Sequence, residues 1–198
     1  MKPYFDTNHA AGLLFLIIVL AWGAMELAEF SQGLSARQGA TRISSRRSWL
    51  AVALCVIAMN VVLYAAPRLV PAAAIRPAGG AFAAGVVVLL SGLILRGWSF
   101  KALGEYFTFT VMVSSDQPVV AAGPYRVLRH PSYTGVLLAC AGVGLASANW
   151  VAMAGVTLLP LVPLLWRIHV EETALLTTVG DSYRAYASQH KRLVPLVW

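Results

Sequence analysis

Five side chains with acid–base or charge chemistry lie at the two ends of one apolar stretch of the chain. Arg129 and His130 stand where the stretch begins, and Arg167, Glu171 and Glu172 follow its end. Ionised groups are costly inside a membrane, so they gather at its surface or at functional sites. If the stretch folds into two antiparallel helices, its ends return to one surface. The sequence therefore predicts a chemical site there, with cations, a histidine and two carboxylates.

The spacing of these groups suggests how they would act. His130 is followed by Pro131, and proline is favoured in the first turn of a helix, whose N-terminal amides carry partial positive charge. An anionic ligand group can dock at such a helix start. Arg167 and Glu171 lie one helical turn apart, which also fits an ordinary ion pair worth about 0.3–0.5 kcal/mol. His169 points about 160° away from Arg167 on that helix, so we place it outside the site.

The composition assigns the chain to the integral membrane proteins. Hydrophobic residues make up 59% of the 198 residues, charged residues make up 12%, and the mean hydropathy is +0.71. That is too apolar for a soluble core with a wettable surface. The two cysteines, Cys55 and Cys140, lie inside apolar windows and indicate neither a disulfide framework nor a CxxC site. We expect no metal.

We predict an all-α fold with five transmembrane helices. A helix rises about 1.5 Å per residue and needs roughly 20 apolar residues to cross a bilayer. Uncharged windows of that length occur at Thr7–Met25, Ser48–Pro67 and Pro77–Leu95. The window 130–166 is too long for one span, and it fits two helices that turn near Ser147–Trp150.

The basic residues orient this arrangement. With the N-terminus outside, the inner loops contain all of the 15 lysines and arginines except Lys2, Arg68 and Arg76. Because positive loops favour the cytoplasmic side, the predicted site faces the cytoplasm. The net charge of +7 follows from this asymmetry and suits anionic lipid headgroups, so nucleic acid need not be invoked.

The chain is predicted to be a single domain, residues 1–198, with two unlike halves. Residues 1–95 would be a three-helix scaffold, in which Glu26, Glu29 and Asn60 are expected to make hydrogen bonds between helices. Nearly every candidate functional residue lies in the half 96–198. The polar loop 96–129 contains glycines and prolines and predicts an irregular cap. Its aromatic residues fit either an interfacial belt or the wall of a ligand pocket.

Several motifs of the C-terminal half together resemble one family. They are LGEYFT at 103–108, GPYRVLRHPSYTG at 123–135, RIHVEETAL at 167–175, GDSYRAY at 180–186 and KRLVP at 191–195. This order is similar to that of the isoprenylcysteine carboxyl methyltransferase family and its relatives among the membrane phospholipid methyltransferases. RHPSYTG followed by a pair of glutamates is specific in combination, although neither part would suffice alone.

The resemblance implies an all-helical membrane enzyme that uses S-adenosylmethionine and yields S-adenosylhomocysteine. The cofactor-binding pocket would lie on the cytosolic side under a cap formed by the C-terminal segment, and a lipophilic or prenylated acceptor would enter from the bilayer. Arg167 would be the catalytic residue that positions the acceptor. The cofactor-binding residues would be Gln117, Val119, Val120, Tyr125, His130, Pro131, Ser132, Tyr133, Glu171 and Glu172.

The acceptor leaves alternatives open. The carboxylate of an isoprenylcysteine-like substrate is ionised at pH 7 and needs only a cation such as Arg167 to orient it. A phospholipid amine must first lose a proton, which requires a base such as Glu172 or His169. Another small lipophilic acid, amine or thiol would also fit. A protein of a different class, a non-enzymatic membrane scaffold or transporter, would have no reason to bind the methyl donor.

Overall fold

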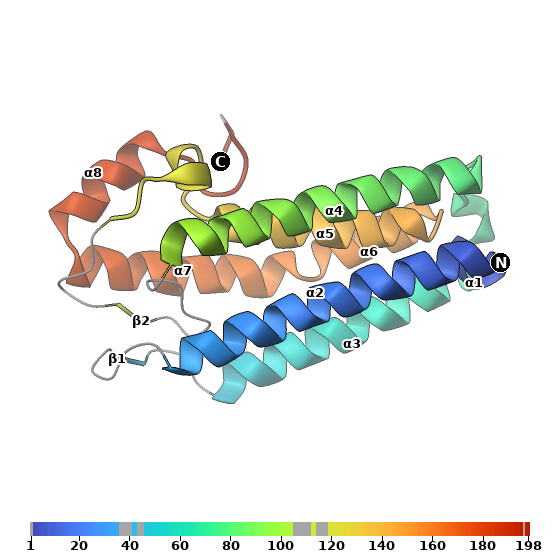
Figure 1. Ribbon diagram of the computed structural model, residues 1–198, viewed down its shortest axis with the longest axis horizontal. Coiled ribbons are helices and arrows are strands. Elements are labelled where there is room, and N and C mark those ends of the chain that lie inside the picture. Colours follow the sequence, from blue (N-terminus) through green and yellow to red (C-terminus); the bar gives the residue numbers. More distant parts are fainter. Residues whose placement is uncertain (1, 36–40, 43–45, 105–111, 114–118, 196) are drawn as a thin grey trace.

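The computed structural model of the chain is an elongated bundle of helices (Figure 1). It describes residues 2–35, 41–42, 46–104, 112–113, 119–195 and 197–198. Its elements are α1 (Tyr4–Thr7), α2 (His9–Ser35), β1 (Thr41–Arg42), α3 (Arg46–Leu69), η1 (Pro71–Ala73), α4 (Ala78–Leu103), β2 (Met112–Val113), η3 (Gly123–Arg126), α5 (Pro131–Ala146), α6 (Trp150–Leu158), α7 (Leu161–Thr178) and α8 (Asp181–Gln189). The two short strands pair antiparallel, and all other elements of the described ranges are helical. The predicted all-helical architecture is confirmed apart from this one ladder.

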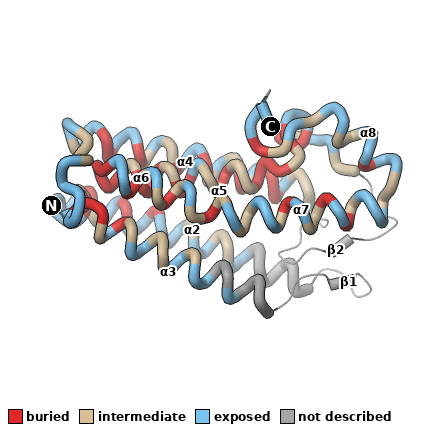
Figure 2. The backbone as a smooth tube through the Cα atoms, turned by 180° about the vertical axis from the view of Figure 1, so that it is seen from behind, coloured by how far each residue is buried: buried red, intermediate tan, exposed pale blue. Residues whose placement is uncertain are grey.

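Apolar helices lie where the hydropathy predicted membrane spans. Within the described residues, three stretches are long and apolar enough to cross a membrane: His9–Ala28, Ala78–Leu103 and Trp150–Thr178. Ala53–Leu69 and Pro131–Ala146 are apolar but shorter. Figure 2 shows many exposed residues along α2 and α3, and large apolar side chains are among them. Such an outer surface is expected of helices that face lipid.

Small residues bring α4 and α5 into backbone contact. A Cβ atom added at Gly92 would lie 2.5 Å from the amide nitrogen of Ala139, and one added at Gly85 would lie 2.4 Å from that of Ala146. Only glycine therefore fits at these two positions of α4. Leu89 lies between them and is fully buried. This close packing of small residues is typical of helices within membranes, and it fixes the position of α5 on α4.

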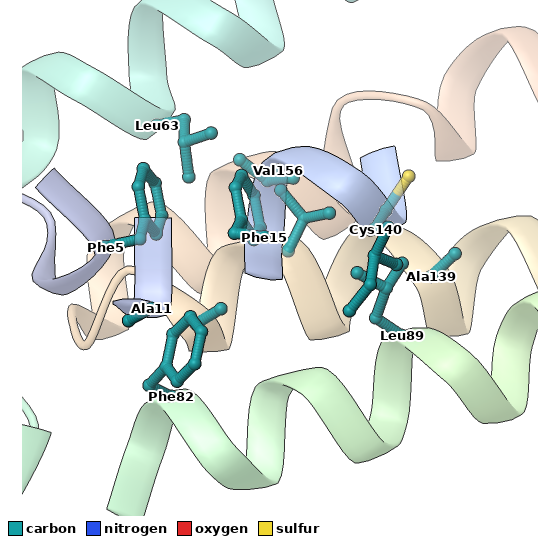
Figure 3. Close-up of a cluster of buried hydrophobic side chains, with 12 residues drawn as sticks. Phe5, Ala11, Phe15, Leu63, Phe82, Leu89, Ala139, Cys140 and Val156 are labelled. Atoms are coloured by element: carbon teal, nitrogen blue, oxygen red, sulfur yellow. The ribbon is translucent and has the colours of Figure 1, made fainter. Parts of the chain in front are cut away.

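The apolar core lies toward the N-terminal end of the bundle. Phe5 stacks on Phe15 with ring centroids 4.2 Å apart. Figure 3 shows Leu63, Phe82 and Val156 around this pair, so that α3, α4 and α6 all contribute to the cluster. The same cluster extends along α4 and α5 toward the other end of the molecule.

The turn between α5 and α6 confirms the sequence prediction. It comprises residues 147–149, and the Asn149 side chain caps α6 by accepting from the amides of Val151 and Ala152 at 3.0 and 3.1 Å. An N-cap asparagine satisfies helix-start amides that otherwise have no partner. The same side chain donates to the carbonyl of Val70, which ties the turn to the end of α3. Near Pro160 the helix breaks again, and α7 begins at Leu161.

Two sequence predictions need correction. The polar loop does not begin at Arg96, because α4 continues to Leu103 and ends at Gly104, which has a positive φ of 54°. Asn60 was expected to bond between helices, but its amide donates to the Val56 carbonyl of its own helix. The side chain of Glu29 lies outside the described residues. Glu26 does bond to another helix, as predicted.

The polar elements gather at one end of the bundle. Figure 1 shows β1, β2, η3, α8 and the C-terminus there, while α1, η1 and the α5–α6 turn lie at the opposite end. The start of α5 and the second half of α7 thereby come together, as expected for a hairpin of apolar helices. The candidate site is built where they meet.

Candidate active site

Glu172 of α7 is the centre of a buried ionic cluster. Its Oε1 accepts a hydrogen bond from Arg129 Nη1 at 2.7 Å and lies 3.2 Å from His130 Nε2. Its Oε2 accepts from both Nε and Nη2 of Arg192, at 3.0 and 2.9 Å. The side chain of Glu172 is only 8% exposed. We call Glu172, Arg129, His130 and Arg192 the Glu172 clamp.

The clamp holds the C-terminal segment against the start of α5. The amides of Arg129 and His130 donate to the carbonyls of Lys191 and Arg192, at 2.7 and 3.0 Å. Thr134 Oγ1 donates to the carbonyl of Leu193 at 2.7 Å. The hydrogen bond to Glu172 raises the pKa of the Arg192 guanidinium, because it favours the charged form. The amide of His130 is thus engaged by protein, which makes this helix start a less open anion site than the sequence suggested.

A second group of side chains lies beside the clamp. The Tyr133 hydroxyl donates to Glu171 Oε2 at 2.8 Å and accepts from Arg167 Nε at 2.8 Å. The Tyr133 ring stacks on His130 with centroids 5.5 Å apart. The side chain of Glu171 is 32% exposed, four times the exposure of Glu172. We call Arg167, Tyr133 and Glu171 the Tyr133 bridge.

A third cluster connects the site to the scaffold helices. Arg96 of α4 makes a two-pronged ion pair with Glu26 of α2, with distances of 2.5 and 2.7 Å. Arg96 Nη1 also donates to the Ser132 hydroxyl at 2.7 Å. Trp22 donates its indole N–H to the same glutamate at 2.9 Å. Ser132 therefore contacts α4, whereas Tyr133, the next residue of α5, contacts Glu171 of α7.

Three tyrosines pack around the site from η3 and α8. The Tyr186 hydroxyl donates to the carbonyl of Tyr125 at 2.7 Å, and burial raises the pKa of Tyr186 to about 12. Burial, and then the nearby charge of Glu171, raise the pKa of the Tyr125 phenol. The Tyr183 pKa is raised by burial and then by Glu172 and Glu171. Its hydroxyl is buried and has no hydrogen-bond partner among the described residues.

Most of the residues predicted for the site do come together, but not all of them can be placed. His130, Tyr133, Arg167, Glu171 and Glu172 form the clamp and the bridge. Pro131 is buried in the first turn of α5, as its sequence position predicted. Val119 and Val120 are half-buried before η3. Gln117 lies outside the described residues. His169 is exposed, which agrees with its exclusion from the site.

Sequence reasoning missed three residues at this end of the molecule, Arg96, Arg192 and Tyr183, and it did not identify the partner of Glu26. Arg96 and Glu26 each follow directly after a predicted span, and that shared position at one membrane surface was a signal that they could pair. Arg192 and Tyr183 belong to the motifs KRLVP and GDSYRAY, which supported the resemblance but received no role. Their place in the site depends on how the C-terminal segment folds back, which local spacing does not determine.

The fold and this cluster define a multi-pass helical membrane protein with a polar site at one end of the bundle. Residues 84–177 match the model described as the isoprenylcysteine carboxyl methyltransferase (ICMT) family. The resemblance predicted from the motifs is therefore confirmed, over the part of the chain that contains α5, α6 and most of α4 and α7.

Individual proteins are also similar to this chain. The chain is 33% identical over 88 residues to the uncharacterized protein YpbQ of Bacillus subtilis (strain 168), which covers 44% of this chain and 52% of that protein. It is 30% identical over 115 residues to the protein-S-isoprenylcysteine O-methyltransferase of Tribolium castaneum, covering 57% of this chain and 41% of that protein. The chain thus spans about half the length of the curated relatives it matches.

A solved structure shows the same fold. It is the eukaryotic intramembrane Ras methyltransferase ICMT (isoprenylcysteine carboxyl methyltransferase), determined without a monobody. The two superpose with a TM-score of 0.59 at 24% sequence identity, over 78% of this chain and 55% of that chain. The shared arrangement of helices extends beyond the region matched by the family model and includes part of the N-terminal scaffold.

Proposed function

We propose that this protein is an S-adenosylmethionine-dependent membrane methyltransferase that transfers a methyl group to a lipophilic acceptor. The observation that carries the proposal is the Tyr133 bridge, which presents one cation and one partly exposed carboxylate at the end of an ICMT-like bundle. A ligand with an ammonium group and an acceptor with a carboxylate would each find an opposite charge there.

The residues of this structure fit the methyl donor. The methionine end of S-adenosylmethionine carries an ammonium group. In the described parts of the chain only Oε2 of Glu171 receives a hydrogen bond, which leaves Oε1 for a cationic ligand group. Both oxygens of Glu172, in contrast, are filled by protein donors. The buried Tyr183 hydroxyl, which has no partner in the same ranges, is a second group that a ligand would satisfy.

We assign the remaining predicted contacts around these two anchors. Glu171 would hold the donor's ammonium group, and Tyr125, His130 and Tyr133 would form the wall beside it. Gln117, Val119 and Val120, which precede η3, remain proposed contacts from the resemblance alone. Glu172 acts through the clamp, by holding His130 and the C-terminal segment in place as a cap over the site.

Methyl transfer mainly requires that the protein position the donor and the acceptor. When bound, S-adenosylmethionine supplies a methyl group on a sulfonium, which is already activated for displacement. The side chains must hold donor and acceptor in line and exclude water. The cap formed by residues 190–193 and α8 would exclude water on the polar side, and the apolar helices would do so on the membrane side.

Arg167 favours a carboxylate as the acceptor. A guanidinium can orient an ionised carboxylate, such as that of an isoprenylcysteine-like substrate, which needs no base at neutral pH. A phospholipid amine would need a base to remove its proton. Glu172 is unsuited to that task because arginines occupy both of its oxygens. His169 is exposed, and helix phase puts it on another face of the helix than Arg167. We therefore prefer the acid acceptor over the amine.

We further propose five membrane spans, with the site at the cytoplasmic surface. The helices α2, α3 and α4 would each cross once, α5 would cross as a fourth span, and α6 with α7 would make the fifth. The basic residues at the end of the bundle that contains the site support this orientation. Cysteine labelling from either side of a vesicle would test it, since Arg126→Cys should react only from the cytoplasmic side.

The first test of the function is titration of the detergent-purified protein with S-adenosylhomocysteine. Saturable binding with one site per chain is expected. No binding by a protein whose circular dichroism shows intact helices would contradict the proposal and favour a scaffold or transporter.

The second test compares acceptors. Methyl transfer from labelled S-adenosylmethionine is expected with an N-acetylated prenylcysteine and not with the same compound carrying an amide in place of its carboxylate. Transfer to phosphatidylethanolamine instead would keep the methyltransferase reading and replace the acceptor.

A further inference from the structure

The start of α5 offers little to the carboxylate that lies beside the ammonium group of the donor. The amides of Arg129 and His130 already donate to carbonyls of the C-terminal segment, at 2.7 and 3.0 Å. Pro131, the next residue, has no amide hydrogen. A ligand carboxylate held close to Glu171 therefore needs other hydrogen-bond donors and a positive charge nearby, since like charges repel.

The Glu172 clamp retains an excess of positive charge. Two guanidinium groups, those of Arg129 and Arg192, meet the single carboxylate of Glu172. Arg129 uses Nε and Nη1, and Arg192 uses Nε and Nη2, in hydrogen bonds to protein. One terminal nitrogen of each guanidinium thus has no protein acceptor in the described residues. The Arg192 side chain is also 37% exposed, so a further anion can reach the cluster.

The hydroxyl of Tyr183 is a neutral donor close to these charges. Tyr183 belongs to α8 and is only 4% exposed, and its hydroxyl makes no hydrogen bond in the described part of the chain. Burial, and then the charges of Glu172 and Glu171, raise the pKa of Tyr183, so that the phenol stays protonated at neutral pH. A buried polar group without a partner is costly unless a ligand supplies one.

We propose that the Tyr183 hydroxyl and the arginines of the Glu172 clamp form the subsite for the donor's carboxylate. Glu171 and the clamp lie on either side of His130, whose Nδ1 is 3.9 Å from Glu171 Oε2 and whose Nε2 is 3.2 Å from Glu172 Oε1. The ammonium group binds Glu171, and the adjacent carboxylate faces the cationic cluster. This inference rests on the proposed function, and it names a specificity of that site, for donors that carry the carboxylate.

Two ligands that differ only in this carboxylate test the proposal. They are S-adenosylhomocysteine and its decarboxylated counterpart, an adenosyl thioether that ends in a propylamine. Calorimetric titration of the detergent-purified parent should give about tenfold tighter binding of S-adenosylhomocysteine. Equal affinity for the two ligands would overturn the proposal. No binding of either ligand by a folded parent would contradict the proposed function as well, so the two failures are distinguishable.

The variant Tyr183→Phe tests the part of the hydroxyl. It keeps the ring and removes no hydrogen bond within the described residues, so the protein should fold. Affinity for S-adenosylhomocysteine should fall about fivefold, and affinity for the decarboxylated ligand should stay within about twofold of the parent. An equal loss for both ligands would show that Tyr183 contacts another part of the donor. That result, or unchanged affinity for S-adenosylhomocysteine, would refute the assignment.

The matched control is Tyr186→Phe, which removes a hydroxyl from the same helix. That hydroxyl donates to the Tyr125 carbonyl at 2.7 Å, so it is already engaged by protein. Any loss of affinity in this variant should affect both ligands equally and leave the preference for S-adenosylhomocysteine at about tenfold. A preference that falls as far in Tyr186→Phe as in Tyr183→Phe would mean that any disturbance of α8 weakens carboxylate binding, and it would overturn the role of the Tyr183 hydroxyl.

Discussion

The Glu172 clamp and the Tyr133 bridge contain neighbouring glutamates in opposite situations. Glu172 is almost fully buried, and arginines or a histidine meet both of its oxygens. Glu171 is four times as exposed and accepts one hydrogen bond within the described residues. A buried carboxylate with saturated oxygens holds protein together, whereas a partly open one beside it can receive a ligand. Two neighbouring glutamates can thus have different roles, one in holding the fold and the other in receiving a ligand.

The largest effect is expected from breaking the clamp. Glu172→Gln leaves Arg129 and Arg192 near each other without a neutralising charge, and removal of one member of a buried ion pair costs about 3 kcal/mol. The C-terminal segment should then open far more often. Hydrogen exchange at the amides of Arg129 and His130, which donate to that segment, should accelerate roughly 100-fold.

The control for this experiment is Asp181→Asn. Asp181 is 93% exposed and, among the described residues, pairs only with the exposed Arg184, so its loss should leave the same amides unchanged. Equal hydrogen-exchange rates in Glu172→Gln and the parent would mean that the clamp does not hold the C-terminal segment. Glu172 would then have no structural role to set against the binding role of Glu171.

The second effect concerns the bridge. Glu171→Gln keeps the hydrogen bond from Tyr133 possible but removes the charge that we assign to the donor's ammonium group. We expect S-adenosylhomocysteine affinity to fall by about 2 kcal/mol, roughly 30-fold, without faster exchange at the Arg129 and His130 amides. Calorimetric titration with S-adenosylhomocysteine measures the affinity, and Asp181→Asn is the control variant. Unchanged affinity in a folded Glu171→Gln protein would remove Glu171 from the donor site.

The smallest effect is expected from Tyr183→Phe. This change should not lower the melting temperature, but it should lower the affinity for the donor. The hydroxyl is buried without a partner in the described residues, so its removal should leave the melting temperature of the ligand-free protein equal or slightly higher. Donor affinity should fall by about 1 kcal/mol, roughly fivefold, if the ligand supplies the missing partner. A lower melting temperature with unchanged affinity would show that Tyr183 supports the fold and does not contact the donor.

Much of this site could be predicted from the sequence, because its main parts lie at the ends of one helical hairpin. The uncharged window 130–166 and the turn near Asn149 predicted a helical hairpin, which brings His130 and Glu171 to the same end of the bundle. Arg167 and the two glutamates could then be chosen as site candidates, because they are charged and most residues around them are apolar. Helix phase placed His169 on another face than Arg167, and the His169 side chain is exposed.

Other features depended on contacts between distant segments. The choice between Glu171 and Glu172 could not be made from spacing, because it depends on the C-terminal segment folding back to bring Arg192 onto one of them. The pairing of Arg96 with Glu26 joins residues 70 positions apart. The helical extension of α4 to Leu103 was missed because a charged residue after an apolar window was taken as the helix end.

The close contact of α4 with α5 has a consequence for attempts to redesign this protein. With backbone touching backbone at Gly85 and Gly92, even one added methyl group would push α5 outward and carry His130 and Tyr133 with it. Changes meant to accept a bulkier or shorter lipid tail are therefore better introduced on α2 and α3, where large apolar side chains are exposed on the outside of the bundle. Gly85 and Gly92 should be kept in such variants, so that α5 and the site residues at its start stay in place while the acceptor specificity is changed.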